Sequence, residues 1–384
     1  MRHDCKIVPH FFSFIYMSKQ FIRKNKEDKP VVAICYDFDK TLSPDDMQAQ
    51  GYIQSVGYEI ESFWKESNGL AEENEMDQNL AYMFTMIQKA HGRFIFNKKT
   101  LMDYGGQVKL FPGVESWFDR IKEYGKQKGV IVEHYIISSG LKEMIEGTKV
   151  ASKFEKIYAS SFYYDKDGVA QWPAQVINYT SKTQFLFRME KGTLDVNDFG
   201  VNDYFAPEDI RIPFRNMIYI GDSDTDIPCM KLVNTNCGHS IGVYNPETKD
   251  KRKVYKMMED KRIKYFAPAD YTYGSELDCL VKAIIDQTVS NEKLVSIHYK
   301  NKREQTSLDV SAVNIENKEK EKLILDLENS NSFKQTHSII AQLKNYASWT
   351  VKEIEQLEKI AQKNIQVSYI INDEDIKEFY DSIK

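Results

Sequence analysis

The sequence predicts an α/β fold with a Rossmann-like parallel sheet that carries helices on both faces. Short apolar runs rich in β-branched residues occupy 30–36, 130–137 and 216–220, and such runs are typical of strands buried on both sides. A further strand is expected over 239–244, and a helix over 114–128. Because strands that alternate with helices form βαβ units, the sheet should be mainly parallel.

The last part of the chain differs in composition from the rest. No glycine or proline follows Gly274, so this region lacks the residues that usually form the turns between strands and helices. Lysine, glutamate, asparagine and serine dominate the first part of this region, which predicts a linker over 289–332, with a solvated helix as the alternative for 300–332. Beyond it, Thr350 and Glu353 have the spacing of a capping box at the start of a helix. We therefore expect an extra helical C-terminal module over 333–384.

The composition narrows the class of protein. Hydrophobic residues make up 42% and charged residues 28% of the chain, as in ordinary globular proteins. The net charge of −5 disfavours nonspecific binding to nucleic acid or to an acidic membrane. Five cysteines without a C-x-x-C pair argue against a disulfide framework and a zinc site. No run approaches the ~20 apolar residues of a membrane span. We expect a soluble, cytoplasmic protein with a disordered leader over 1–29.

Two carboxylates follow the first predicted strand. Asp37 and Asp39 belong to the string D-F-D-K-T, which ends at Thr41 and comes directly after the apolar run 30–36. In parallel sheets, ligand sites lie outside the carboxyl ends of the strands. A solvated turn would also explain two acidic residues, but their position straight after a buried strand favours a functional site.

Polar residues also follow the next two predicted strands. Ser138, Ser139 and Gly140 form a turn whose hydroxyl and backbone N–H groups suit a phosphate oxygen. Asp222 and Asp226 lie in the string G-D-S-D-T-D after the third strand. Clustered carboxylates repel one another unless a cation offsets their charge, and Mg²⁺ would supply that offset.

Together with Lys182, these elements resemble the four motifs of the haloacid dehalogenase (HAD)-like hydrolase superfamily. The motifs are D-x-D-x-T, a strand-end Ser or Thr, a Lys, and G-D-x-x-x-D, and the resemblance covers about 30–288. It is nearest to the phosphoserine-phosphatase-like branch, which has a helical cap inserted after the first motif. Asp39 separates the chain from dehalogenases, which lack an acid at this position. The P-type ATPase string D-K-T-G-T is absent, so phosphatases and phosphomutases remain.

The resemblance implies a Mg²⁺-dependent phosphomonoester hydrolase that forms an aspartyl-phosphate on Asp37. Asp39 would protonate the leaving alcohol and then activate water. Mg²⁺ would be held by Asp37, the backbone carbonyl of Asp39, and Asp222. Ser138 and Lys182 would bind the phosphoryl group, and Ser139 and Gly140 would complete the substrate-binding turn. Thr41 would position Asp39 beside the substrate. Asp226 would join the metal site or orient Lys182.

The resemblance also divides the chain into domains. It implies a catalytic core over 30–43 and 111–288, and a helical cap over 44–110 that closes over the site. One apolar helix face is expected inside the cap, formed by Leu80, Met83, Phe84 and Ile87.

The substrate stays open at the level of sequence. A small phosphorylated metabolite is the first hypothesis, and the second is a phosphomutase that uses the same intermediate. The third is a phosphatase that acts on a macromolecule-bound phosphate recruited by the C-terminal helices. Those helices would also serve for self-association or for binding a protein partner, because their apolar stripes must pack on something.

Overall fold

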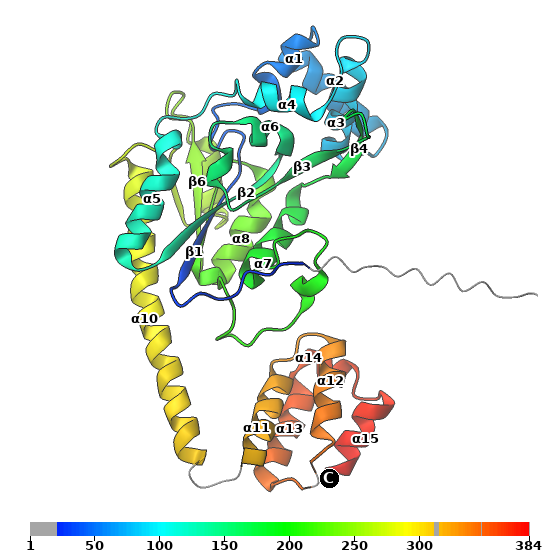
Figure 1. Cartoon of the computed structure of the whole chain (residues 1–384), viewed down its shortest axis with the longest axis vertical. Coiled ribbons are helices and arrows are strands. Elements are labelled where there is room, and N and C mark those ends of the chain that lie inside the picture. The colour runs from blue at the N-terminus through cyan, green and yellow to red at the C-terminus, as the bar shows by residue number, and fades with distance from the viewer. Residues whose placement is uncertain (1–20, 311–314, 347, 384) are drawn as a thin grey trace, which may run out of the picture.

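The core of the protein is a seven-stranded sheet with the strand order β4-β3-β2-β1-β5-β6-β7. The computed structural model describes residues 21–310, 315–346 and 348–383 (Figure 1). All neighbouring strands run parallel except β3 and β4, which form an antiparallel hairpin. The predicted α/β architecture is therefore confirmed. The strands are β1 (Val31–Tyr36), β2 (Ile131–Leu141), β3 (Lys156–Tyr164), β4 (Ala170–Gln175), β5 (Met217–Gly221), β6 (His239–Tyr244) and β7 (Tyr265–Pro268).

Helices cover both faces of the sheet because successive β1 side chains enter opposite cores. The side chains of Val32, Ile34 and Tyr36 pack with residues of α5 (Val114–Lys128) and α10 (Glu276–Val310). Ala33 and Cys35 point to the other face and pack with residues of α7 (Thr183–Lys191), α8 (Ile227–Thr235) and α9 (Arg252–Glu259). Every β1 residue is buried, as expected for a central parallel strand.

Four helices are inserted between β1 and α5, beyond the carboxyl ends of the central strands (Figure 1). They are α1 (Tyr52–Ser55), α2 (Ile60–Glu73), α3 (Gln78–Ala90) and α4 (Lys98–Gly105). Helix α4 lies so close to α6 (Lys142–Gly147) that a Cβ on Gly105 would come 1.9 Å from the carbonyl oxygen of Met144. This contact fastens the inserted helices to the core just after the end of β2.

The structure corrects the predicted disordered leader where it can be described. Residues 1–20 of that leader lie outside the described residues, whereas 21–29 run along the core. The backbone N–H of Lys24 donates to Gly192 O (3.0 Å), and its ammonium contacts Glu133 (2.8 Å). Glu27 in turn pairs with Arg211. This segment is held by ion pairs that composition alone does not reveal.

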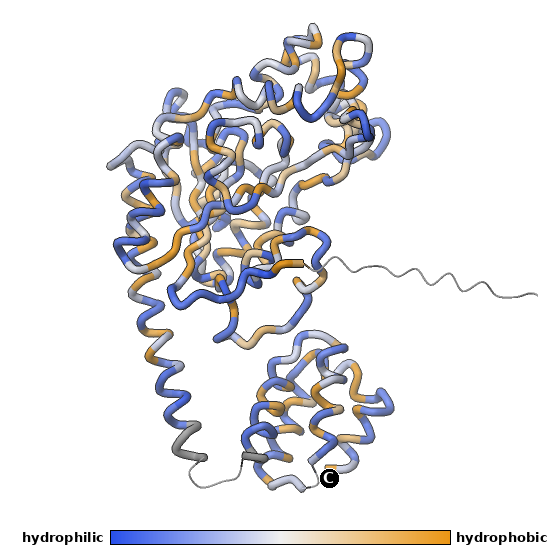
Figure 2. The backbone as a smooth tube through the Cα atoms, viewed as in Figure 1, coloured by the Kyte–Doolittle hydropathy of each residue, from blue (hydrophilic) through white to orange (hydrophobic). Residues whose placement is uncertain are grey.

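Most of the region 289–332, predicted as a linker or a solvated helix, is helical. Helix α10 continues to Val310, and α11 (Ile315–Glu328) belongs to a separate helical bundle. Figure 2 shows that α10 becomes mostly hydrophilic where it extends beyond the sheet. The bundle has its own apolar core, and its other helices are α12 (Phe333–Leu343), α13 (Val351–Lys363), α14 (Ile365–Tyr369) and α15 (Glu374–Ser382).

The capping box at the start of α13 is present as predicted. The side chain of Thr350 accepts from the backbone N–H of Glu353 (3.3 Å), and Glu353 accepts from the N–H of Thr350 (2.7 Å). Across the described residues, no helix is both long and apolar enough to cross a membrane.

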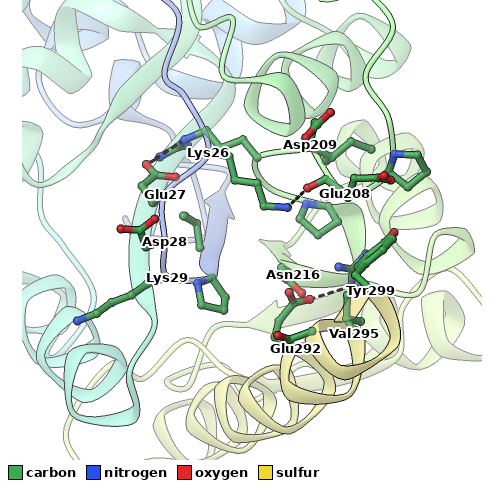
Figure 3. Close-up of a pocket in the computed structure, with 18 of the residues that line it drawn as sticks. Lys26, Glu27, Asp28, Lys29, Glu208, Asp209, Asn216, Glu292, Val295 and Tyr299 are labelled. Atoms are coloured by element: carbon green, nitrogen blue, oxygen red, sulfur yellow. Dashed lines mark hydrogen bonds and ion pairs between the residues drawn. The ribbon is translucent and has the colours of Figure 1, made fainter. Parts of the chain in front are cut away.

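A cavity of about 1120 Å³ lies at the amino ends of the strands, between the core, α10 and α11. Figure 3 shows the part of its wall formed by the core and α10. Lys26 bonds to Glu208 O on its wall, and Arg215 pairs with Glu292 (2.8 Å). Its charges are mixed, and it borders Val31 at the start of β1. The polar residues picked out from the sequence lie at the other end of that strand.

Candidate active site

The predicted site residues converge where three neighbouring strands end. Asp37 directly follows β1, Ser138 lies near the end of β2, and Asp222 directly follows β5. These strands are adjacent in the order β2-β1-β5, so their carboxyl ends meet at one edge. The backbone N–H of Asp37 donates to Ile220 O (3.0 Å), which fixes the first loop against β5.

Lys182 reaches this edge from the short helix η3 (Tyr179–Lys182). Its side chain is fully buried, and its Nζ lies 2.8 Å from Asp226 Oδ1 and 3.3 Å from Asp37 Oδ1. Burial opposes the charge of the ammonium, but the two carboxylates outweigh burial and raise the pKa of Lys182 above its usual value. A fixed cation therefore sits beside Asp37.

Asp226 is surrounded by donors from the protein. Its Oδ1 accepts from Lys182 and from the Tyr219 hydroxyl (2.9 Å), and its Oδ2 accepts from both the N–H and the hydroxyl of Ser223 (3.1 and 3.0 Å). Gly221 is required here, because a Cβ would lie 2.5 Å from Asp226 Oδ2. With both oxygens bonded, Asp226 is placed to orient Lys182, which was one of its two predicted roles.

Three carboxylates form a cluster that fits a divalent cation. Oxygen atoms of Asp37, Asp222 and Asp226 all lie within 4.8 Å of one another. Burial and the charges of Asp37 and Asp226 raise the pKa of Asp222 to about 8. Burial and Asp226, opposed by Lys182, raise the pKa of Asp37 to about 6. The raised pKa values of Asp37 and Asp222 mean that Lys182 alone does not offset three ionised carboxylates, and hard oxygen ligands are those that Mg²⁺ prefers.

Asp39 lies in a different environment from Asp37. Its Oδ1 accepts from the backbone N–H of Met47 (2.8 Å). Gly140 allows the close approach of the other oxygen, because a Cβ there would lie 2.7 Å from Asp39 Oδ2. Burial, followed by the charges of Asp46 and Asp37, raises the pKa of the Asp39 carboxyl well above its usual value. A carboxyl group that holds its proton is suited to act as a general acid.

The turn predicted at Ser138–Gly140 lies within β2 rather than after it, as an irregular stretch where the pairing with β3 shifts, and it presents polar groups toward the same region. The Ser138 hydroxyl accepts from the backbone N–H of Gly140 (3.1 Å). Ser139 Oγ is buried without a hydrogen-bond partner among the described residues. Thr41 is buried too, and its hydroxyl donates to Asp222 Oδ1 (3.4 Å). The geometry therefore gives Thr41 a partner other than the predicted Asp39.

Several residues near the site were missed from the sequence. Tyr219 and Ser223 both donate to Asp226, and the exposed Lys253 lies 3.9 Å from Asp222. A signal existed only for Ser223, because Ser223 and Asp226 have capping-box spacing. Tyr219 looks like any apolar strand residue, and Lys253 comes from the separate helix α9.

Comparison with known proteins places the chain in a family. A model described as "haloacid dehalogenase-like hydrolase" matches residues 34–231, just over half of the chain. The protein belongs to the haloacid dehalogenase-like hydrolase family, and it is therefore a hydrolase by class. This agrees with the order of motifs along the chain and with their meeting at one edge of the sheet.

Individual relatives are distant. An uncharacterized protein of Borreliella burgdorferi is 27% identical over 281 residues, which cover 65% of this chain and 95% of that protein. A haloacid dehalogenase family hydrolase from Salmonella enterica is 16% identical with a TM-score of 0.43, covering 67% of this chain and 73% of the other. A phosphoserine phosphatase with a phospho-aspartyl intermediate analogue is 14% identical with a TM-score of 0.40. The match covers 66% of this chain and 99% of the other.

Proposed function

We propose that this protein is a Mg²⁺-dependent phosphomonoester hydrolase that works through an aspartyl-phosphate on Asp37. The observation that carries the proposal is the pairing of Asp37 with the buried ammonium of Lys182, beside a second carboxyl group, Asp39, whose pKa burial raises well above its usual value. A nucleophile beside a fixed cation and an adjacent acid are the parts that phosphoryl transfer requires.

In the first step an oxygen of Asp37 attacks phosphorus and the bond from phosphorus to the substrate oxygen breaks. The leaving alcohol takes its proton from Asp39. In the second step Asp39 removes a proton from water, the water oxygen attacks phosphorus, and the bond to Asp37 breaks to release inorganic phosphate. Ser138 and Lys182 bind phosphoryl oxygens throughout, and Asp226 keeps Lys182 in place.

The metal site would be formed by Asp37, Asp222 and the backbone carbonyl of Asp39, with Asp226 next to it. Bound Mg²⁺ would neutralise phosphoryl charge and hold the phosphate in line with Asp37. Thr41 bonds to Asp222 and so fixes the orientation of that ligand.

A small phosphorylated metabolite is the substrate class that the geometry favours. Asp37 is only 5% exposed, and Ser138 and Lys182 are fully buried. The inserted helices stand over the strand ends, as a cap that closes on its substrate would. A phosphate on a bulky folded partner would not reach Asp37 in this state.

The test is hydrolysis of p-nitrophenyl phosphate and of a panel of phosphorylated metabolites by the full chain with Mg²⁺. Asp37→Asn should abolish turnover and leave the circular dichroism spectrum unchanged, while Asp103→Asn, a change in an exposed carboxylate of α4, should be neutral. Excess chelator should silence the enzyme and Mg²⁺ should restore it, with Ca²⁺ a poor substitute. Wild-type rates from Asp37→Asn, or full activity in chelator, would contradict the mechanism.

The same assay separates hydrolysis from transfer to a second substrate. Stoichiometric release of inorganic phosphate without an added acceptor indicates a hydrolase. A rate that depends on an added sugar phosphate or alcohol, without phosphate release, would indicate a mutase instead. Acid-quenched enzyme should carry one phosphoryl group, located on the peptide that contains Asp37.

A further inference from the structure

Helix α3 contacts the core through two polar side chains on one face. The Tyr82 hydroxyl donates to Ser139 O (2.9 Å), and Asn79 Nδ2 donates to Ile177 O (2.7 Å). The two residues are three apart and therefore lie on the same side of the helix. Both are buried, with exposed fractions of 5% for Tyr82 and 8% for Asn79.

The acceptor of Tyr82 belongs to the turn that carries Ser138. Pairing between β2 and β3 shifts between Ser138 and Leu141, so the ladder skips Ser139 and Gly140. The carbonyl of Ser139 is partly buried and lies outside that ladder, and the Tyr82 hydroxyl provides its donor. The position of this turn therefore depends on a residue of the inserted helices.

The acceptor of Asn79 belongs to the segment that delivers Lys182. Ile177 is followed by Asn178, whose side chain caps η3 by accepting from the N–H of Tyr179 (3.0 Å). Lys182 is the last residue of η3. A shift of Ile177 would move this cap, and with it the ammonium beside Asp37.

The surroundings of Tyr82 pack against its ring and favour the neutral form of its hydroxyl. The ring packs edge-on against Trp64, with 6.0 Å between centroids. Burial, and then the charge of Asp39, raises the pKa of Tyr82 above its usual value. The phenol is therefore a permanent donor that lies near the proposed general acid.

We propose that Asn79 and Tyr82 are positioning residues that tie the inserted helices to the two phosphate-binding segments, the Ser138–Gly140 turn and η3. This rests on the proposed function, because it assigns a purpose to two contacts of that same site. Closure of α3 on the core fixes the positions of the Ser138 hydroxyl and the Lys182 ammonium at the same time. Phosphate bound between these segments in turn stabilises the closed position of α3.

The kinetic test compares two tyrosines of the inserted helices. Tyr82→Phe removes the hydroxyl that reaches the core. Tyr52→Phe is the matched control, because Tyr52 is fully buried and its hydroxyl donates to Met86 O (2.5 Å) inside the inserted helices. With p-nitrophenyl phosphate and Mg²⁺, Tyr82→Phe should lower kcat about three- to tenfold, as expected for one lost hydrogen bond, with little change in KM. Tyr52→Phe should stay within about twofold of wild type.

A second measurement does not depend on activity. Hydrogen exchange is followed with Mg²⁺, with and without inorganic phosphate, in the full-length wild type and both variants. In wild type and Tyr52→Phe, phosphate should slow exchange at the Ser138–Gly140 turn and also along α3. In Tyr82→Phe the slowing should persist at the turn and be lost along α3. Asn79→Leu should similarly uncouple α3 from residues 177–182.

The outcomes keep the two proposals apart. If wild type hydrolyses no phosphomonoester, the proposed function fails, while the exchange experiment still decides the roles of Asn79 and Tyr82. Equal slowing of α3 in Tyr82→Phe and wild type would overturn the positioning role. So would a wild type in which phosphate leaves α3 unaffected, or equal kcat losses in Tyr82→Phe and Tyr52→Phe.

Discussion

Replacing Lys182 by methionine tests how charge is balanced at the site. The substitution keeps an apolar chain of similar length and removes the buried ammonium that contacts Asp37 and Asp226. Leaving buried carboxylates without their partner typically costs about 3–5 kcal/mol of unfolding free energy. The loss of unfolding free energy should be greatest at pH 8.5, where the carboxylates are ionised. Asp37 and Asp222 have raised pKa values of about 6 and 8, so they take up protons as pH falls. The difference in stability between Lys182→Met and wild type should therefore be smaller at pH 6.

Magnesium should stabilise Lys182→Met more than wild type, because the competing positive charge is gone. A ligand at 100 times its Kd adds about 2.7 kcal/mol to the native state. The assay is hydrogen exchange of β1 and β5 amides in rising urea, which reports the core separately from the C-terminal bundle. Lys24→Met is the control, because Lys24 also bridges two carboxylates, Glu133 (2.8 Å) and Glu155 (2.6 Å), but lies away from the site. A Lys182→Met core as stable as wild type in chelator at pH 8.5, or no extra gain from Mg²⁺, would refute the reasoning.

Three further predictions concern other parts of the molecule. Burial opposes the charge of Glu133, but hydrogen bonds led by Arg211 lower its pKa to about 2. The carboxylate should therefore add about 3 kcal/mol to the free energy of unfolding above pH 4.5, and this contribution should be lost as pH falls through 2. Glu133→Gln should therefore unfold more readily than wild type at pH 7, with the gap closing in acid; a gap independent of pH would contradict this. Gly140→Ala should reduce kcat strongly while the fold persists, since its Cβ would lie 2.7 Å from Asp39 Oδ2; unchanged kinetics would show that the turn gives way. Deleting 315–384 should leave turnover of a small phosphomonoester nearly unchanged, because the bundle has its own core; a large fall in kcat/KM would place it in the active unit.

The parts of the site that could be predicted are those fixed by strand periodicity. Asp37, Ser138 and Asp222 follow apolar runs, and parallel strands bring the ends of such runs together. Lys182 is different, because a single lysine in a loop carries no pattern of its own. It was found only through the order of family motifs.

Within the inserted helices, periodicity gave the helix and part of its buried face, since Met83 of the predicted stripe is fully buried. The predicted apolar stripe of α3 included Phe84, which is 47% exposed, whereas Tyr82 and Met86 are buried. The helix packs against both α2 and the core, so its buried surface turns toward the Ser138–Gly140 turn. A hydroxyl that must reach a carbonyl on another domain leaves no trace in a hydrophobic pattern.

The C-terminal region shows how polar composition can hide a packed helix. Lysine and glutamate are good helix formers, and a bundle helix needs only a narrow apolar seam. In α11, Ile324 and Leu327 provide that seam. Lys320 is buried as well, because it donates to Ser348 O (2.6 Å) and pairs with Glu353 (2.9 Å). These partners lie about 30 residues away in sequence, beyond the reach of local patterns.

The placement of the bundle limits what it can deliver to the enzyme. It stands beyond the amino ends of the strands (Figure 1), whereas Asp37 directly follows the carboxyl end of β1. A six-residue strand such as β1 spans about 20 Å. A protein held by the bundle could therefore offer its phosphate only on a loose tail long enough to pass around the sheet, and its modification would then depend on tail length as tethered reactions do. Ligands without such a tail would be anchored near the enzyme and remain untouched by it.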